Sequence, residues 1–370
     1  MSPRSQPRPV VATRPMARRT RRRRTVAALG LTAALIAGTT YGAWRYIDEN
    51  EYLLDARCEV QVGEHQQRLS PEQADSAALL AATAVERQLP PAAAVHAVAM
   101  SLQETELQLR ADDPDPGERE LFARGRPAWS DQAGAEQVPV TVNGFFDLLE
   151  ERYEAALAAE EESEDEDDDA EDTEDEDSAG EYWQPEMELD VASEALDRPH
   201  NAQFYPEHYD RSRAFAAPLA GQSQVDFSCT LSQLEVPGPD PEGTAEELIA
   251  VVPTALEIPF TEPEDDDEDE GDEDGETEDD DVAPEPLPEG IVEVTGSGEE
   301  AVVTVTAPPA DEFYDYQWMV AHWAVASAER FGIQSVTAGS QQWTRDNSHW
   351  ESTDEPTEAD TVVIGFTRDI

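Results

Sequence analysis

The order of apolar and polar residues divides the chain into extended, helical and unpatterned stretches. Residues 56–69 (ARCEVQVGEHQQRL) alternate on either side of Gly63 and predict a β-hairpin. The segment Ser70-Pro71-Glu72-Gln73 predicts a helix start with Ser70 as the N-cap, and Pro90-Pro91 ends that helix near residue 89. A second helix begins there and carries Glu104 near its C-terminal end.

Further periodic segments complete the predicted fold. Residues 138–159 are predicted to contain a helix, and further helices are predicted over residues 187–196, 207–219 and 311–331, the last ended by Gly332. Residues 291–296 with 301–307, and 333–338 with 341–346, predict two hairpins, and residues 361–367 predict a buried strand. We therefore expect an α+β multidomain protein, with a mostly helical domain over residues 56–231 and a small α+β domain over residues 291–370.

One apolar segment is long enough to cross a membrane. Residues 26–47 (VAALGLTAALIAGTTYGAWRYI) carry a single charge, Arg45, and at about 1.5 Å per residue they span a hydrocarbon core of ~30 Å. Ten arginines lie in residues 1–45, and no acid occurs before Asp48, so the N-terminus is predicted to stay in the cytoplasm. The pattern predicts a disordered tail (1–25), a signal anchor in the lipid bilayer and an extracytoplasmic remainder. A cleavable signal peptide is the alternative, but Tyr41-Gly42-Ala43 places a bulky residue where a cleavage site has a small one.

Charge changes the expected partners. The 370 residues carry a formal net charge of −60, with 84 acidic residues against 24 basic ones, all arginine. An acidic insertion at 160–181 and a linker at 235–290 are predicted to be solvated and disordered. An acidic body repels nucleic acid, which binds to basic faces. The acidic runs are expected to bind cations diffusely, and such a surface stays soluble at high ionic strength.

The remaining chemistry is sparse. Cys58 and Cys229 follow a predicted membrane segment, so we expect one disulfide; two unrelated buried thiols are the alternative. The six histidines show no metal-ligand spacing, and no phosphate-binding loop or nucleophile arrangement occurs. Neither a metal nor a cofactor is predicted. The four tryptophans of the C-terminal part are more typical of a core, with stacking on sugar rings as the alternative: Trp318, Trp323, Trp343 and Trp350.

Several segments occur in an order that is recognisable as a whole. They are the Cys58 hairpin, SPEQADSAALLAATAVERQLP, AVAMSLQETEL, Leu121-Phe122, VTVNGFFDLL, the run from Phe204 to Tyr209, and the closure from Gly221 to Leu231. In this order they resemble an actinobacterial family of single-pass membrane proteins. That family has a lysozyme-like extracytoplasmic domain of the soluble lytic transglycosylase type. WMVAHWAVASAERFGIQSV and QQWTRD are similar to the family's second domain.

The resemblance implies a peptidoglycan-facing cleft around Glu104. In such a cleft Glu104 would protonate the glycosidic oxygen and then act as base on the sugar's 6-hydroxyl, giving an anhydro product. The resemblance also implies ligand contacts from four other residues: Leu121, Phe122, Trp129 and Tyr209.

The chain departs from the family beside Glu104. Glu120 stands where the family has Gly, Ala123 where it has Gln, and Thr105 where it has Ser. We therefore expect a membrane-anchored cell-envelope protein of binding or structural type that faces peptidoglycan. The alternatives are a weakly active lytic transglycosylase that uses Glu104, and an extracytoplasmic scaffold spaced by its acidic linkers.

Overall fold

The computed structural model describes residues 56–63, 65–110, 115–124, 138–165, 182–233, 236–251, 291–310 and 313–368. The predicted tail (1–25), the predicted anchor (26–47) and the acidic residues 166–181 and 252–290 lie outside these ranges. Within them, no helix has both the length and the apolar character needed to cross a membrane. They form eight α-helices and three antiparallel sheets, which confirms a mixed α+β fold.

A three-stranded sheet closes the first part of the chain. Strand β1 (Arg57–Val62) lies between β2 (His65–Leu69) and β5 (Phe227–Thr230), and both neighbours are antiparallel to it. Cys58 and Cys229 face each other across β1 and β5 and form a disulfide over a sequence separation of 171. The predicted hairpin and the predicted disulfide are therefore confirmed.

Two alanine-rich helices form the centre of this part. Helix α2 (Pro71–Glu86) begins with the predicted capping box, in which Ser70 and Gln73 each bond the other's backbone N–H. Helix α3 (Pro91–Thr105) follows, and the small side chains of both helices allow close packing.

The other helices of this part differ in length from the predictions. Helix α4 (Val142–Asp165) continues into the predicted acidic insertion, because glutamate is a good helix former. Helices α5 (Leu189–Ala195) and α6 (Tyr209–Leu219) correspond to the helices predicted over 187–196 and 207–219 but are shorter, and the 3₁₀ segment η4 (Pro199–His208) joins them. A short hairpin that was not predicted follows the 3₁₀ turn η2 (Pro116–Glu118): β3 (Glu120–Arg124) with β4 (Val138–Thr141).

The C-terminal part is a six-stranded antiparallel sheet with the strand order β10-β9-β8-β11-β7-β6. Both predicted hairpins and the predicted buried strand are confirmed, and β10 is an addition. The strands are β6 (Val292–Thr295), β7 (Val302–Thr306), β8 (Ser335–Ala338), β9 (Gln341–Thr344), β10 (Trp350–Ser352) and β11 (Thr361–Gly365).

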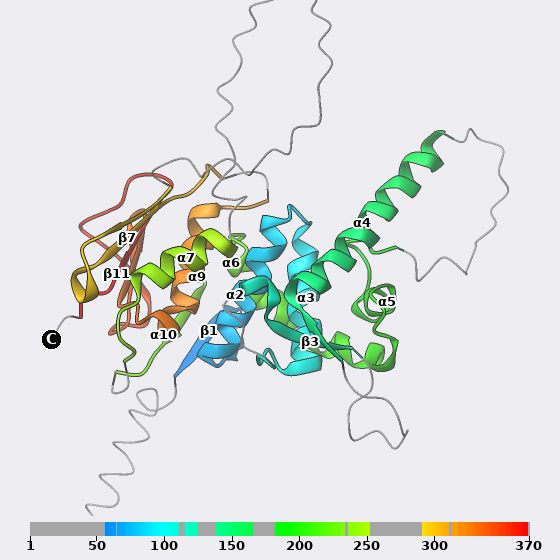
Figure 1. Cartoon of the computed structure of the whole chain (residues 1–370), viewed down its shortest axis with the longest axis horizontal. Helices are drawn as coiled ribbons and strands as arrows, with labels where there is room; N and C mark the ends of the chain where they lie inside the picture. The colour runs from blue at the N-terminus through cyan, green and yellow to red at the C-terminus, as the bar shows by residue number, and fades with distance from the viewer. Residues whose placement is uncertain are drawn as a thin grey trace, which may run out of the picture. The chain divides into compact units, whose positions relative to one another are not determined.

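Three helices pack beside this sheet (Figure 1). The predicted helix over 311–331 is two helices, α9 (Tyr316–Ala326) and α10 (Ala328–Phe331), and Gly332 ends the second with a φ of 70°. Helix α7 (Pro241–Val251) lies within the predicted linker and buries Leu248 and Val251.

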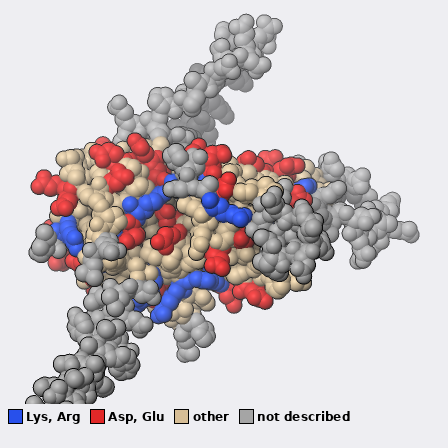
Figure 2. Space-filling view, turned by 60° about the horizontal axis from the view of Figure 1, so that its bottom comes forward, with Lys and Arg blue, Asp and Glu red and all other residues tan. Residues whose placement is uncertain are grey.

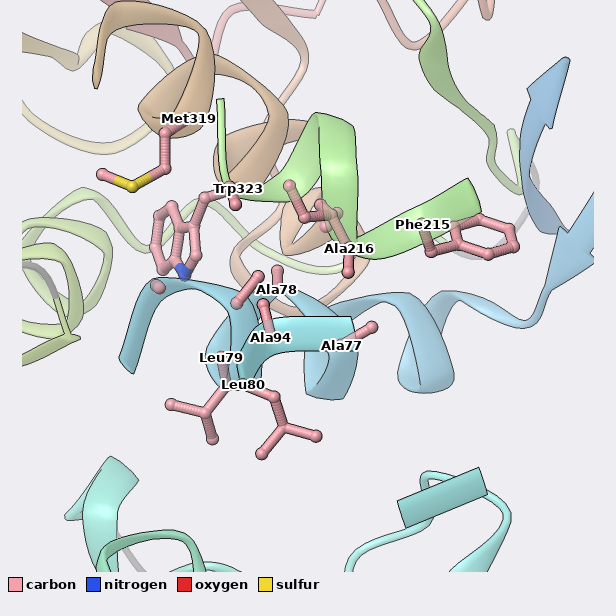
Figure 3. Close-up of a cluster of buried hydrophobic side chains, with 14 of the residues drawn as sticks. Ala77, Ala78, Leu79, Leu80, Ala94, Phe215, Ala216, Met319 and Trp323 are labelled. Carbon is pink, nitrogen blue, oxygen red and sulfur yellow. The ribbon is translucent and has the colours of Figure 1, made fainter. Parts of the chain in front are cut away.

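Residues 55–370 form one compact unit with a shared core. Helix α9 packs against α2 and α6, and Figure 3 shows the Trp323 ring of α9 pointing toward the helix that contributes Ala78. The Tyr314 hydroxyl donates to the backbone carbonyl of Leu89 at 2.7 Å. The parts before and after the long acidic stretch therefore support each other, and a groove between them can hold a fixed shape.

Candidate functional site

Glu104 lies in the last turn of α3, at a tightly fixed helix end. The two residues that follow the helix, Glu106 and Leu107, have φ values of 58° and 56°, so the chain turns sharply away. The hydroxyls of Ser101 and Thr105 both donate to the carbonyl of Leu121, at 2.8 and 2.7 Å. These bonds hold β3 directly beside the end of α3.

The carboxylate of Glu104 is enclosed by hydrogen-bond donors. Arg198 Nη1 lies 2.5 Å from both of its oxygens, the Tyr205 hydroxyl donates to Oε1 at 2.9 Å, and the backbone N–H of Ala123 donates to Oε2 at 2.8 Å. The side chains of Glu104 and Arg198 are only 2% and 1% exposed. Since each of these partners donates, the arrangement suits an ionised carboxylate.

Aromatic rings hold the guanidinium of Arg198 in place. Its central carbon lies 5.3 Å from the ring centre of Phe122 and 5.1 Å from that of Phe145, and the two rings stack on each other. Among the described residues its Nε and Nη2 have no hydrogen-bond partner. Burial and the nearby charge of Glu104 raise the pKa of Tyr205, so its hydroxyl remains a donor. Glu104 and Arg198 therefore form a closed, buried ion pair, to which Tyr205 adds a hydrogen bond.

The residues predicted to surround Glu104 are only partly assembled around it. The Phe122 ring contacts Arg198, and the carbonyl of Leu121 accepts the bond from Thr105 that holds β3 at the end of α3. The side chains of Leu121 and Phe122 are fully buried. Tyr209 is 42% exposed at the start of α6, and Trp129 lies outside the described residues. The sequence analysis missed Arg198 and Tyr205 as partners. Tyr205 belongs to a segment that carried the family resemblance, but nothing in the sequence pairs Arg198 with Glu104.

Two hollows of the described surface differ in size, and the larger of them does not include this cluster. It has a volume of about 1310 Å³ and lies between α2, α7, α10 and the segment after α3. Ion pairs occupy its arginines: Arg119 makes a bidentate pair with Glu247 at 2.7 and 2.6 Å, and Arg330 bonds the same carboxylate.

These ion pairs attach α7 to its neighbours. Ser327 also donates to Asp75, at 2.6 Å. Burial raises the pKa of Asp75 by more than Arg330 lowers it. Burial acts in the same direction on Glu247, but the bonds and charges of Arg119 and Arg330 outweigh it and lower the pKa of that carboxyl. The charged residues of the larger hollow therefore hold neighbouring helices together, and its arginines are not free to bind a ligand.

The second hollow has a different chemistry. It has a volume of about 650 Å³ and lies between the β1–β2 hairpin, the β8–β9 turn, the segment that leads into β10, and the start of α9. Of its 17 lining residues, only Glu59 and Asp226 are of the charged types Asp, Glu, Lys and Arg, which make up 29% of the chain, and His349 lines it as well. The face of the molecule in Figure 2, by contrast, carries many scattered acidic side chains. We call this hollow the glutamine groove, after Gln61, Gln66, Gln224, Gln317 and Gln341.

Two tryptophans form an aromatic wall of the glutamine groove. Trp350 is partly exposed, and its Nε1 donates to the carbonyl of Phe227 at 2.8 Å, which fixes the ring. It packs edge-on against the largely buried Trp318, with ring centres 5.1 Å apart. His322 lies against both rings, and burial lowers its pKa to about 4, so it is neutral. The wall is therefore rigid and uncharged.

Comparisons with known proteins give no direct guide to this chain. No protein-family model, curated protein or solved structure matches it. Within the described ranges, no group of three or more His, Cys, Asp or Glu residues is placed to hold a metal ion. The function is therefore inferred from the chemistry of the Glu104 cluster and of the glutamine groove.

Proposed function

We propose that the chain is a membrane-anchored cell-envelope protein that binds the sugar strands of peptidoglycan in the glutamine groove and does not cleave them. The composition of the groove carries this proposal. Amide side chains and a partly exposed tryptophan gather there, on a protein that otherwise presents many carboxylates. Amides exchange hydrogen bonds with sugar hydroxyls, and an aromatic face covers the apolar face of a sugar ring. The volume of about 650 Å³ is also within the range of small-ligand sites.

The state of Glu104 supports binding over cleavage. A general acid must hold a proton and reach the glycosidic oxygen. Glu104 instead accepts bonds from Arg198, Tyr205 and the backbone of Ala123, and its side chain is almost fully buried. In this proposal the lysozyme-like resemblance of residues 56–231 reflects ancestry, and the ion pair has taken the place of the acid. A transglycosylase that uses Glu104 would need this ion pair to open first.

Location at the outer face of the membrane is part of the same proposal. Residues 26–47 would anchor the chain in the bilayer, and the arginine-rich tail would stay in the cytoplasm. The Cys58–Cys229 disulfide supports this orientation, because such bonds persist in oxidising compartments. The acidic stretches would keep the binding unit hydrated near the cell wall.

Sedimentation with insoluble peptidoglycan tests the binding proposal. The purified full chain is mixed with peptidoglycan at high salt, which screens the large net charge. We expect the wild type to sediment with peptidoglycan, and Trp350→Ala to weaken binding roughly tenfold through the lost aromatic face, about 1.4 kcal/mol. Trp350→Phe retains a ring and should bind more strongly than Trp350→Ala.

Tyr209→Ala serves as the matched control, because Tyr209 is exposed and lies outside the glutamine groove. It should bind like the wild type. If the wild type stays in solution, peptidoglycan binding is refuted. If Tyr209→Ala loses binding while Trp350→Ala keeps it, the ligand site lies elsewhere.

A further inference from the structure

Three glutamines of the groove have a side-chain orientation that their own hydrogen bonds determine. In each, the amide nitrogen donates to a group that has no proton to give, so exchanging the amide oxygen and nitrogen would place two acceptors against each other. The bonds run from Gln61 to the Gly63 carbonyl (2.8 Å), from Gln317 to the Thr361 carbonyl (2.9 Å) and from Gln224 to the Asp315 carboxylate (3.2 Å).

The orientation of these amides leaves acceptors available to a ligand. Among the described residues, the Oε1 atoms of Gln61, Gln224 and Gln317 have no hydrogen-bond donor, while one N–H of each amide is already used. Gln66 differs, because it donates to Glu59 and accepts from Arg68. The acidic residues that line the groove are also acceptors. At these three positions the glutamine groove therefore offers hydrogen-bond acceptors, beside the one remaining N–H of each amide.

We propose that the glutamine groove selects uncharged sugars through their free hydroxyl groups, with Gln61, Gln224 and Gln317 as specificity-determining residues. This inference rests on the proposed function and names the ligand class of the same groove. A free sugar hydroxyl can donate to an amide oxygen, whereas an alkylated sugar oxygen can only accept. The glutamine oxygen and the alkylated sugar oxygen would then face each other as two acceptors without a donor. A site built to bond a hydroxyl rejects an analogue that lacks it far more strongly than an apolar pocket does. Anionic polymers are disfavoured by the acceptors and by the net charge of −60.

A pair of matched oligosaccharides tests the inference. The probes are a tetrasaccharide of β-1,4-linked N-acetylglucosamine and its O-methylated form, which keeps the same ring faces but has no free hydroxyl. Calorimetric titration of the full chain with each sugar should show at least roughly 100-fold weaker binding of the methylated form. Equal affinities would overturn the inference and leave the proposed function standing. If neither sugar binds while peptidoglycan still sediments with the protein, the inference alone fails; if both assays are negative, the proposed function fails too.

Two variants separate selection from folding. Gln317→Met keeps the size of the side chain and removes the acceptor, so it should weaken the unmodified sugar roughly tenfold and leave the methylated one unchanged. Gln203→Met makes the same change at an exposed residue outside the groove, so both affinities should stay at wild-type values. If Gln317→Met weakens both sugars equally, its effect is structural and the inference is wrong. Thermal unfolding of each variant confirms that it folds.

Discussion

Replacing Arg198 is the sharpest perturbation of the buried ion pair. Arg198→Met removes the positive charge and keeps an apolar side chain over Phe122 and Phe145, but it leaves the Glu104 carboxylate buried without a counter-charge. Removal of one partner of a buried pair costs about 3–5 kcal/mol of unfolding free energy. The bonds from Tyr205 and the backbone of Ala123 remain, so we expect a value near the lower end of that range.

A second substitution should restore much of the lost stability. In Glu104→Gln with Arg198→Met no buried charge is left unpaired, and the glutamine oxygen can still accept from Tyr205 or Ala123. Replacement of a whole buried ion pair by neutral residues is often close to neutral. We therefore expect the double variant to be more stable than Arg198→Met alone by roughly 2 kcal/mol or more. Glu104→Gln alone completes the double-mutant cycle that gives the coupling energy.

Urea unfolding of the full chain, followed by tryptophan fluorescence at fixed salt, measures these differences. Asp147→Asn is the control: Asp147 pairs with Arg87 at 2.7 Å but is 65% exposed, so the loss should stay below about 1 kcal/mol. A loss below about 1 kcal/mol for Arg198→Met would show that water already reaches Glu104. A double variant no more stable than Arg198→Met would also refute the closed ion pair.

Three further predictions follow from other parts of the structure. Reduction of the Cys58–Cys229 disulfide should lower the unfolding free energy by roughly 3–5 kcal/mol, because it frees a loop with a sequence separation of 171; urea unfolding with and without reductant measures this. Burial lowers the pKa of both His96 and His322 from 6.5 to about 4, so the unfolded chain binds these protons first and the unfolding free energy falls as the pH drops from 6.5 to 4. His322→Phe removes one of these groups and should make the fall less steep in thermal melts across this pH range. An unchanged pH profile would contradict the prediction. Gly221→Ala should destabilise the protein by more than Gly63→Ala. Both glycines have a positive φ, but a Cβ at Gly221 would lie 2.3 Å from the backbone oxygen of Asp315, whereas a Cβ at Gly63 would meet nothing. Equal melting temperatures of the two variants would refute this.

Local sequence patterns predicted the elements whose causes are local. Ser70 and Gln73 lie three residues apart and form their capping box within one turn. The hairpins around Gly63 and Gly339 follow from alternation and a turn residue between strands. The cysteine pair was also predictable, because two cysteines allow a single disulfide within the chain.

The partners of Glu104 could not be predicted in this way. Arg198 is 94 residues away in sequence, and its approach depends on how η4 folds back onto α3. The same limit applies to the glutamine groove, whose walls come from both ends of the described chain. Trp350 is partly exposed in the groove, whereas Trp318, Trp323 and Trp343 are buried, and nothing in their sequence context separates the four; only the tertiary structure does. Helix α7 lies in a segment that was predicted to be a linker because residues 235–290 are rich in Pro, Glu and Asp; its apolar residues Leu248 and Val251 pack into the core.

Binding without cleavage is tested most directly by exposing the full chain to radiolabelled peptidoglycan strands and measuring bound label and released anhydro-sugar products in the same sample. We expect bound label that falls in Trp350→Ala, with no anhydro products above a protein-free control. Anhydro products that appear with the wild type and disappear with Glu104→Gln would contradict the proposal and identify Glu104 as a catalytic acid.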